Sequence, residues 1–466
     1  MLIDSNSMDG YIQKVYDKNK QKIEKTGTKP KMLCITYGCQ ANVHDSEKVS
    51  GLLHEMGYES CESESESDII VYNTCCVREN AENKVFGHLG QVKKLKEKNK
   101  DLKIIVCGCM VQQDVVIEKI KESYKFVDVI FGTFNLHRLP ELLFTSMETN
   151  SLIIDIWQDA AEVVEDMPTI RQHKFKASVN IMHGCDNYCS YCIVPYVRGR
   201  ERSRSPESII KEIEGLAKSG VVEVMLLGQN VNSYGKGLDV NISFASLISQ
   251  VAKIDGIKRI RFMTSHPKDF SDELIEAIKN NDNICKYVHL PVQSGSSAVL
   301  ERMNRNYTKE SYLELVRKLR TAIPDIAITT DIITGFPYET DTDNDETIDV
   351  IKKVRYSGAF TFIYSKRTGT PAASMDCQVD EKVTKKRFDK ILDILNPIVY
   401  EISKAHVGHT YEVLAEEVSK NDERLLTGRL CDNSIVHFEG DESLIGQFLT
   451  VEIVDCKTFY LIGNVV

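Results

Sequence analysis

The sequence lacks several features that would assign it to common classes of protein. Its 466 residues contain no apolar run of about eighteen residues, so we expect no membrane span. The beginning of the chain has no apolar signal core, so we expect a cytoplasmic rather than a secreted protein. The net charge of −10 argues against a general nucleic-acid binder, although basic runs such as 198–204 allow local RNA contacts.

The composition is that of an ordinary globular protein. It is 42% hydrophobic and 27% charged, and the length allows two to four domains. The chain carries 14 cysteines. In a reducing compartment these are better suited to serve as thiolate ligands than to form disulfides.

Alternating patterns predict an α/β multidomain fold. Residues 1–29 are polar and predict a mobile tail or an accessory helix. Over 30–148, strand-like apolar runs alternate with helical patterns, which predicts a doubly wound parallel sheet. Residues 149–170 are expected to be a linker, and a short hairpin is expected within 149–175.

The remaining chain predicts two further domains. Residues 171–403 contain six strand–helix units, too few for a closed eight-stranded barrel, so we expect a partial (β/α)6 barrel. Residues 404–466 contain five short strands, which indicates a small five-stranded β-barrel of the oligonucleotide-binding kind.

Three closely spaced cysteines, Cys185, Cys189 and Cys192, lie in the stretch HGCDNYCSYC. Three thiolates can bind three irons of a [4Fe–4S] cluster and leave the fourth iron open to a small molecule. The alternative is a zinc knuckle that takes a fourth ligand such as His183.

A second cysteine set is spread over the N-terminal domain. Cys39, Cys75 and Cys109 each follow a predicted parallel strand. Because the carboxyl ends of parallel strands lie on one edge, we expect these thiols to meet and bind a metal centre. Cys76 directly follows Cys75, so either cysteine could be the second ligand of this set. The spacing favours Cys75.

The cysteine loop resembles the radical S-adenosylmethionine superfamily, whose signature has an aromatic residue where Tyr191 stands. The chain is also similar to the methylthiotransferase family over about residues 30–466. The matching stretches are TYGCQAN, NTCCVRENAE, GCMVQ, HGCDNYCSYCIVPYVRGRERSR, LLGQNVNSYG, LPVQSGS, MNRNYT, TDIITGFPYET and YSKRTGTPAA.

The resemblance implies two [4Fe–4S] clusters and S-adenosylmethionine as cofactors. By this resemblance the catalytic cluster is bound by Cys185, Cys189 and Cys192. An auxiliary cluster is bound by Cys39, Cys75 and Cys109. It also implies a set of cofactor-binding residues at the ends of two strands and in the cysteine loop: Tyr191, Gly228, Gln229, Asn230, Asp331 and Gly335.

The stretch LLGQNVNSYG resembles the MiaB branch, which adds a methylthio group to C2 of N6-isopentenyladenosine 37 in tRNA. By this resemblance one S-adenosylmethionine supplies the methyl group, another supplies a 5′-deoxyadenosyl radical, and the auxiliary cluster supplies sulfur. The alternatives are the same chemistry on threonylcarbamoyl-adenosine or on a ribosomal-protein aspartate, or an iron–sulfur RNA-binding protein without turnover.

The C-terminal barrel resembles a TRAM domain, an RNA-binding module. Arginines that could contact tRNA phosphates are Arg198, Arg200, Arg204, Arg424 and Arg429. Those near the cysteine loop could instead pair with Glu201 and Glu207. The resemblance further implies an electron donor such as flavodoxin or ferredoxin, and we expect a monomer.

Overall fold

The computed structural model describes residues 7–76, 79–158, 164 and 167–466. The chain divides into two compact units. The N-terminal unit contains the chain up to Gln172 together with His183–Asp186 and Ile193–Arg202. The barrel unit contains His173–Met182, Asn187–Cys192 and Ser203–Val466.

A six-stranded parallel sheet forms the centre of the N-terminal unit, with strand order β2-β1-β3-β4-β5-β6. Every residue of β3 and β4 is buried, as expected for central strands that are covered on both faces. The strands are β1 (Lys31–Thr36), β2 (Glu59–Ser60), β3 (Ile69–Thr74), β4 (Lys103–Gly108), β5 (Val129–Phe131) and β6 (Ile153–Asp155).

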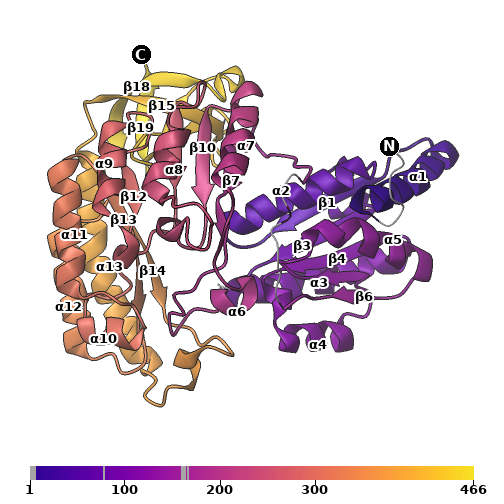
Figure 1. Ribbon diagram of the computed structural model, residues 1–466, viewed down its shortest axis with the longest axis horizontal. Coiled ribbons are helices and arrows are strands. Elements are labelled where there is room, and N and C mark those ends of the chain that lie inside the picture. Colours follow the sequence, from indigo (N-terminus) through magenta and orange to yellow (C-terminus); the bar gives the residue numbers. More distant parts are fainter. Residues whose placement is uncertain (1–6, 77–78, 159–163, 165–166) are drawn as a thin grey trace. The chain divides into compact units, whose positions relative to one another are not determined.

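Helices cover both faces of this sheet, which confirms the predicted doubly wound architecture (Figure 1). Ile69 and Val71 of β3 pack on one face with α1 (Met8–Thr26), α2 (Gln40–Glu55) and α5 (Leu139–Thr149). Ile70 and Tyr72 pack on the other face with α3 (Glu79–Lys98) and α4 (Asp114–Ser123). The alternation along β3 follows the two-residue period of a strand.

Two segments refine the sequence-based expectations. The N-terminal segment forms the helix α1, capped by Ser7 and anchored by the buried Val15, so the accessory-helix alternative is confirmed. The predicted hairpin within 149–175 is wrong for the described residues, because β6 pairs in parallel with β5 and extends the sheet. Residues 1–6, 159–163 and 165–166 of these two segments lie outside the described residues.

Six parallel strands form the barrel unit's first part, in two three-stranded sheets ordered β11-β10-β7 and β12-β13-β14. An isolated parallel bridge joins Ile260 of β11 to Ile284, which lies just before β12. The strands are β7 (Lys176–Asn180), β10 (Glu223–Leu227), β11 (Arg259–Phe262), β12 (Tyr287–His289), β13 (Ala327–Thr334) and β14 (Gly358–Ile363). This arrangement agrees with a partial, open (β/α)6 barrel.

Amphipathic helices separate these strands and bury their apolar stripes against them. They are α7 (Pro206–Lys218), α8 (Phe244–Val251), α9 (Asp272–Asn280), α10 (Ser297–Arg302), α11 (Lys309–Ala322) and α12 (Asp341–Val354). The short elements around the cysteine loop are β8 (Met182–His183), α6 (Val194–Arg198) and β9 (Arg202–Ser203). Among the described residues, no helix combines the length and the apolar character that a membrane crossing requires.

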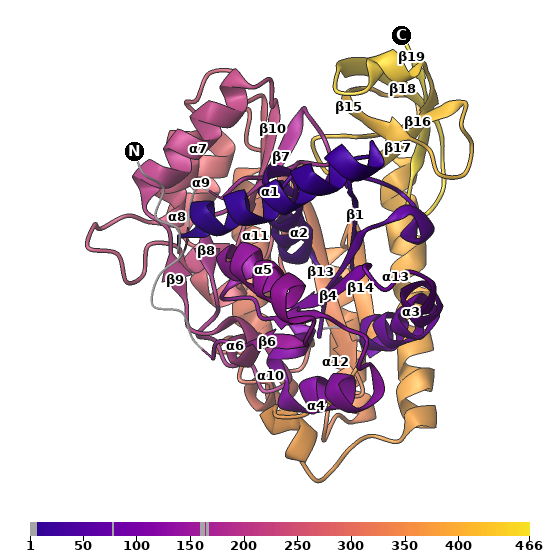
Figure 2. The same cartoon turned by 90° about the vertical axis from the view of Figure 1, so that its right-hand side faces the viewer.

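The long helix α13 (Glu381–Lys404) leads into a closed five-stranded barrel at one end of the barrel unit (Figures 1 and 2). Two buried arginines of β11 bond to its backbone: Arg259 Nη1 donates to Arg429 O at 2.8 Å and Arg261 Nη2 to Leu430 O at 2.7 Å. The strands are β15 (Thr410–Val418), β16 (Leu425–Arg429), β17 (Ile435–Glu439), β18 (Phe448–Cys456) and β19 (Leu461–Val465).

Candidate functional site

The three cysteines of the N-terminal unit lie at the carboxyl ends of three adjacent strands. Cys39 follows β1 as the N-cap of α2, Cys75 follows β3, and Cys109 follows β4. The amide Oδ1 of Asn42 lies 3.9 Å from Cys39 Sγ and 3.6 Å from Cys109 Sγ. The structure therefore brings these two thiols to one buried side chain.

Cys75 lies next to the residue that precedes Cys39. A Cβ atom on Gly38, whose φ is +128°, would be 2.5 Å from Cys75 Cβ and 3.0 Å from Cys75 Sγ. Glycine at position 38 thus lets the first and second strand ends approach. The neighbouring Cys76 packs against Cys109 instead. Both cysteines of the pair are near other members of the set, and the choice of Cys75 as the ligand stays a prediction.

Arg198 is the charged group at this cysteine set. Its Nε donates to Cys109 Sγ at 3.2 Å, and its Nη2 donates to Asn42 Oδ1 at 2.8 Å and to Asp45 Oδ2 at 2.9 Å. A hydrogen bond from Cys76 and the charge of Arg198 lower the pKa of Cys109 to about 6, against the effect of burial. The electrostatics favour the thiolate, which is the form that binds iron.

This position does not favour the predicted RNA contact of Arg198. The side chain is buried, and its hydrogen bonds to Cys109, Asn42 and Asp45 all go to groups of the N-terminal unit. Arg204 is likewise buried, with Nη1 donating to Asn180 O at 2.8 Å and to Glu212 at 2.7 Å. A phosphate would have to displace these partners. Burial therefore argues against RNA contacts by Arg198 and Arg204.

The other three predicted RNA contacts are more accessible. The Arg200 side chain is 69% exposed and pairs with Asp186, and the Arg424 side chain is 83% exposed and pairs with Asp422. Arg429 is partly exposed and pairs with Glu416. The exposed pairs of Arg200 and Arg424 are weak enough for a phosphate to compete with them, whereas the partner of Arg429, Glu416, is buried.

The cysteine loop is shaped by close backbone packing at its start. Gly184 has φ +71°, and a Cβ there would lie 2.0 Å from the carbonyl oxygen of Arg200. Cys185 N donates to Gly199 O at 3.1 Å in the same N-terminal unit. Glycine is required before Cys185 because no side chain fits between these two backbone segments.

Cys189 and Cys192 belong to the barrel unit, where the Cys192 amide donates to Cys189 O at 2.9 Å. Arg305 Nη1 donates to the buried Cys189 Sγ at 3.6 Å, and Nη2 donates to Pro291 O at 3.0 Å. A buried guanidinium beside a thiolate compensates its negative charge. Arg305 stands in the stretch MNRNYT, which sequence reasoning noted without assigning it a role.

The predicted cofactor residues divide by location. Tyr191 packs beside Met303 and Phe336, and burial raises its pKa. Gly228 follows β10, where a Cβ would be 2.5 Å from Met182 Cγ, and Gly335 follows β13 with φ +78°. Gln229 and Asn230 follow Gly228, and Asn230 Nδ2 donates to Asp269 at 2.7 Å. Asp331 instead lies within β13 rather than at its carboxyl end.

Buried polar atoms without a hydrogen-bond partner in the described structure gather after the carboxyl ends of four strands of the barrel unit. They are Asn230 Oδ1 after β10, Ser265 Oγ and His266 Nε2 after β11, Thr334 Oγ1 at the end of β13, and Tyr364 Oη after β14. Orphaned buried polar groups in a protein usually indicate a missing ligand or water. We call this set of side chains the polar edge of the barrel unit. It fits a cofactor rich in polar groups, such as S-adenosylmethionine.

Sequence reasoning missed Ser265 and His266. Burial, with smaller contributions from nearby cationic groups, lowers the pKa of His266 to about 2, so the imidazole is neutral. The signal was the stretch TSHP directly after a predicted strand. In parallel sheets such positions face the ligand edge.

The cysteine sets differ from a site for a single ion. No three of the described His, Cys, Asp and Glu side chains converge closely enough to hold one metal ion. A four-iron cluster has each thiolate on a different iron, so its ligands need not converge in that way.

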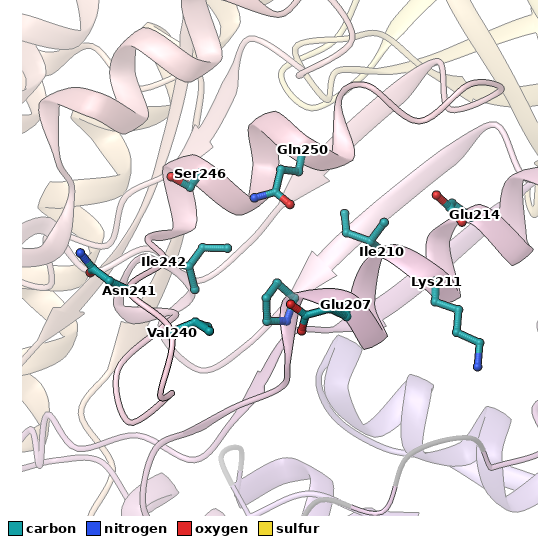
Figure 3. Close-up of a pocket in the computed structure, with 10 residues that line it drawn as sticks. Glu207, Ile210, Lys211, Glu214, Val240, Asn241, Ile242, Ser246 and Gln250 are labelled. Atoms are coloured by element: carbon teal, nitrogen blue, oxygen red, sulfur yellow. The ribbon is translucent and has the colours of Figure 1, made fainter.

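A groove on the outside of the barrel unit lies apart from these residues (Figure 3). It is lined by the outer side of α7, including Ile210 and Lys211, by Ile242, and by Ser246 and Gln250 of α8. The opposite side of α7 packs on the sheet. None of the predicted site residues lines this groove.

Comparisons with known families agree with this geometry. Residues 179–351 match the model of the Radical SAM superfamily, residues 31–132 match "Uncharacterized protein family UPF0004", and residues 404–466 match the TRAM domain. The fold and the cysteine loop thus define a radical S-adenosylmethionine protein with a TRAM barrel. Such a protein uses S-adenosylmethionine together with an iron–sulfur cluster.

Curated relatives identify the family within the radical S-adenosylmethionine proteins to which the chain belongs. A tRNA-2-methylthio-N(6)-dimethylallyladenosine synthase of Lachnoclostridium phytofermentans is 54% identical over 92% of this chain and 94% of its own length. A protein of the same name from Alkaliphilus oremlandii is 53% identical over 96% of this chain and 94% of its own length. The chain belongs to this family of tRNA-2-methylthio-N(6)-dimethylallyladenosine synthases.

Solved structures support the fold alone. The radical S-adenosylmethionine methyltransferase TsrM from Kitasatospora setae aligns with a TM-score of 0.53 at 15% identity, over 74% of this chain and 77% of its own. The cobalamin-dependent radical enzyme OxsB aligns with a TM-score of 0.51 at 13% identity, over 79% of this chain and 57% of its own. Both alignments extend beyond the barrel unit and concern the fold, not the substrate.

Proposed function

We propose that this chain adds a methylthio group to C2 of N6-isopentenyladenosine 37 in tRNA. The observation that carries the proposal is the family membership at more than 50% identity over nearly the whole chain. The cysteine loop, the polar edge of the barrel unit and the TRAM barrel support it. The relatives do not favour the threonylcarbamoyl-adenosine, ribosomal-protein or non-catalytic alternatives.

We assign the catalytic cluster to Cys185, Cys189 and Cys192, and an auxiliary [4Fe–4S] cluster to Cys39, Cys75 and Cys109. When bound, the catalytic cluster and S-adenosylmethionine supply a 5′-deoxyadenosyl radical, which can take a hydrogen atom that no side-chain base could remove. Arg305 compensates the charge of Cys189, and Arg198 that of Cys109.

The polar edge of the barrel unit would hold S-adenosylmethionine. Tyr191, within the cysteine loop, packs beside Met303 and Phe336, while Gly228 and Gly335 let the chain turn away from the strand ends. Gln229 and Asn230 present amides at the end of β10, where Asn230 Oδ1 accepts no hydrogen bond from the described residues. Donors of the cofactor's amino group would satisfy such an acceptor.

The sulfur in this proposal comes from the auxiliary cluster, and a second S-adenosylmethionine is the methyl donor. The proposed RNA contacts are Arg200 and Arg424, whose side chains are exposed, together with the partly exposed Arg429. We further propose a monomer that acts in the cytoplasm and receives electrons from a flavodoxin or ferredoxin.

The test is anaerobic turnover with reconstituted protein, dithionite and S-adenosylmethionine. We expect isopentenylated tRNA to gain a methylthio group and 5′-deoxyadenosine to be released, and the Cys189→Ala variant to do neither. If only threonylcarbamoyl-adenosine tRNA or a ribosomal protein were modified, the substrate assignment would be wrong. If no 5′-deoxyadenosine were released, the non-catalytic alternative would stand.

A further inference from the structure

One face of the sheet β12-β13-β14 carries exposed and partly buried side chains next to one buried histidine, His289. Along β13, Ile328 and Ile332 point into the core, while Thr329, Asp331 and Ile333 point to the opposite face and are only partly covered. The register places Phe360 of β14 beside Asp331 and Phe362 beside Ile333, and His289 of β12 beside Thr329. We call His289, Asp331, Phe360 and Phe362 the open sheet face.

Two phenyl rings on this face are strongly exposed. Phe360 is 52% exposed and Phe362 is 37% exposed. They lie two residues apart on β14, so their Cα atoms are about 7 Å apart along one line. In the described part of the chain β14 pairs only with β13, and both rings remain exposed to solvent. Adjacent exposed aromatic side chains are typical of a binding surface.

A carboxylate stands beside the rings. His289 Nε2 lies 3.4 Å from Asp331 Oδ1, and its Nδ1 lies 3.0 Å from Thr329 Oγ1. The His289 ring meets the Phe360 ring edge-on, with centroids 5.8 Å apart. The Asp331 side chain is 26% exposed, and its Oδ2 accepts no hydrogen bond from the described residues. The face thus offers an apolar aromatic surface next to one available acceptor.

The open sheet face connects two regions with separate roles. At the amino end of β12, the Tyr287 hydroxyl shares a hydrogen bond with Thr329 Oγ1 at 2.8 Å and lies near Asn433 in the β16–β17 turn of the TRAM barrel. At the carboxyl ends lie Thr334 and Tyr364, which belong to the polar edge assigned to the cofactor. A base projecting from RNA held at the TRAM barrel would pass over this face before it reached the cofactor.

We propose that the open sheet face binds the N6-isopentenyladenine base of the RNA substrate, with Phe360 and Phe362 against the purine and its prenyl tail and Asp331 accepting the N6–H. The inference rests on the proposed function and names the residues that select its substrate. The face is matched to this base because an N6-alkylated adenine has a flat ring, a single N6–H donor and an apolar tail. Stacking of bases on aromatic side chains is a general mode of single-stranded RNA recognition.

This assignment moves Asp331 from the cofactor, where the sequence prediction put it, to the substrate. The polar atoms that lack partners lie at the strand ends, whereas Asp331 lies within β13. The adenine of S-adenosylmethionine carries no apolar tail, so it would leave Phe362 uncovered. Removing the ring of Phe360 or Phe362 therefore distinguishes the two ligands. It should weaken binding of the isopentenylated RNA and leave binding of S-adenosylmethionine unchanged.

The experiment measures equilibrium binding without turnover. Reconstituted full-length protein is titrated anaerobically, without S-adenosylmethionine, with an anticodon stem-loop RNA carrying N6-isopentenyladenosine and with the same RNA carrying adenosine. We expect the wild type to prefer the isopentenylated RNA. Phe360→Ala should weaken its binding by at least about five-fold and reduce the preference, from the usual contribution of base–aromatic stacking.

Two further variants keep the test interpretable. Phe360→Leu retains apolar volume and should preserve the fold while losing most of the ring's contribution. Tyr400→Ala removes a comparably exposed ring from α13 and should leave both RNA affinities unchanged. Binding of S-adenosylmethionine, measured by equilibrium dialysis, should be the same for all variants.

The inference is overturned if Phe360→Ala keeps the full preference, if the wild type has none, or if the variant loses affinity for S-adenosylmethionine instead. Wild-type turnover on isopentenylated tRNA tests the proposed function separately. A wild type that forms the methylthio product while Phe360→Ala keeps its RNA preference would refute this inference alone.

Discussion

At the scale of single residues, Arg198 shows how a surface-type residue becomes part of a buried site. It sits in the basic stretch RGRERSR and was predicted to contact RNA. In the folded chain it joins Asp45, Asn42 and Cys109. Its neighbour Arg200, two residues further on, stays exposed and pairs with Asp186. Burial, rather than residue type, distinguishes Arg198, which contacts the cysteine set, from Arg200, which is accessible to solvent.

Replacing Arg198 by Met should therefore be costly. The change leaves the buried Asp45 carboxylate without its partner, and breaking such a pair typically costs about 3–5 kcal/mol. The matched change Arg200→Met removes an exposed pair and should cost less than about 1 kcal/mol. Denaturant unfolding of cluster-free protein measures both values. Equal values for the two variants would contradict the buried network.

At the scale of elements, the TRAM barrel is held to the rest of its unit by polar contacts. Arg259 and Arg261 of β11 donate to backbone carbonyls of residues 429 and 430. After α13, His406 Nε2 lies 2.9 Å from Asp432 Oδ2 in the β16–β17 turn. These bonds fix the barrel close to the amino ends of β11 and β12, next to the open sheet face.

The His406–Asp432 pair predicts a pH dependence of stability. Burial would lower the pKa of His406, but the hydrogen bond and charge of Asp432 outweigh it and raise the pKa above 6.5. Because the folded pKa is raised, the stabilisation is fully present below pH 6.5 and is lost as pH rises through the folded value. Thermal melts between pH 6 and pH 9 should show this decline, and His406→Gln should flatten it. An unchanged slope in the variant would exclude the pair as the cause.

At the scale of the whole molecule, the chain crosses between its two compact units around the cysteine loop. Cys185 belongs to the N-terminal unit, whereas Cys189 and Cys192 belong to the barrel unit. The N-terminal unit also contains Cys39, Cys75 and Cys109. Two separate thiolate sets predict two separately removable iron–sulfur clusters.

Iron counts on anaerobically purified protein test this prediction. The wild type should hold about eight irons, as expected for two four-iron clusters, and the variant with Cys185, Cys189 and Cys192 changed to Ala should hold about four. The variant with Cys39, Cys75 and Cys109 changed to Ala should also hold about four. Loss of all iron in either variant would contradict independent clusters.

Local patterns were sufficient to predict most of the architecture. Continuous apolar runs such as IIVY indicated buried parallel strands, and the spacing of the helical patterns indicated doubly wound and barrel units. The hairpin expected within 149–175 is wrong for the described residues, because a three-residue strand carries too little pattern to show its partner. Pairing with β5 depends on contacts that are distant along the chain.

The two cysteine sets and the family followed from the sequence alone, because ligand spacing and motifs are local properties. The partners of those cysteines did not. Asn42, Asp45 and Arg198 are up to 156 residues apart in the chain, and only folding brings them to one thiol. The same holds for the exposure of Phe360 and Phe362, since a strand's sequence does not reveal which of its faces the rest of the molecule will leave uncovered.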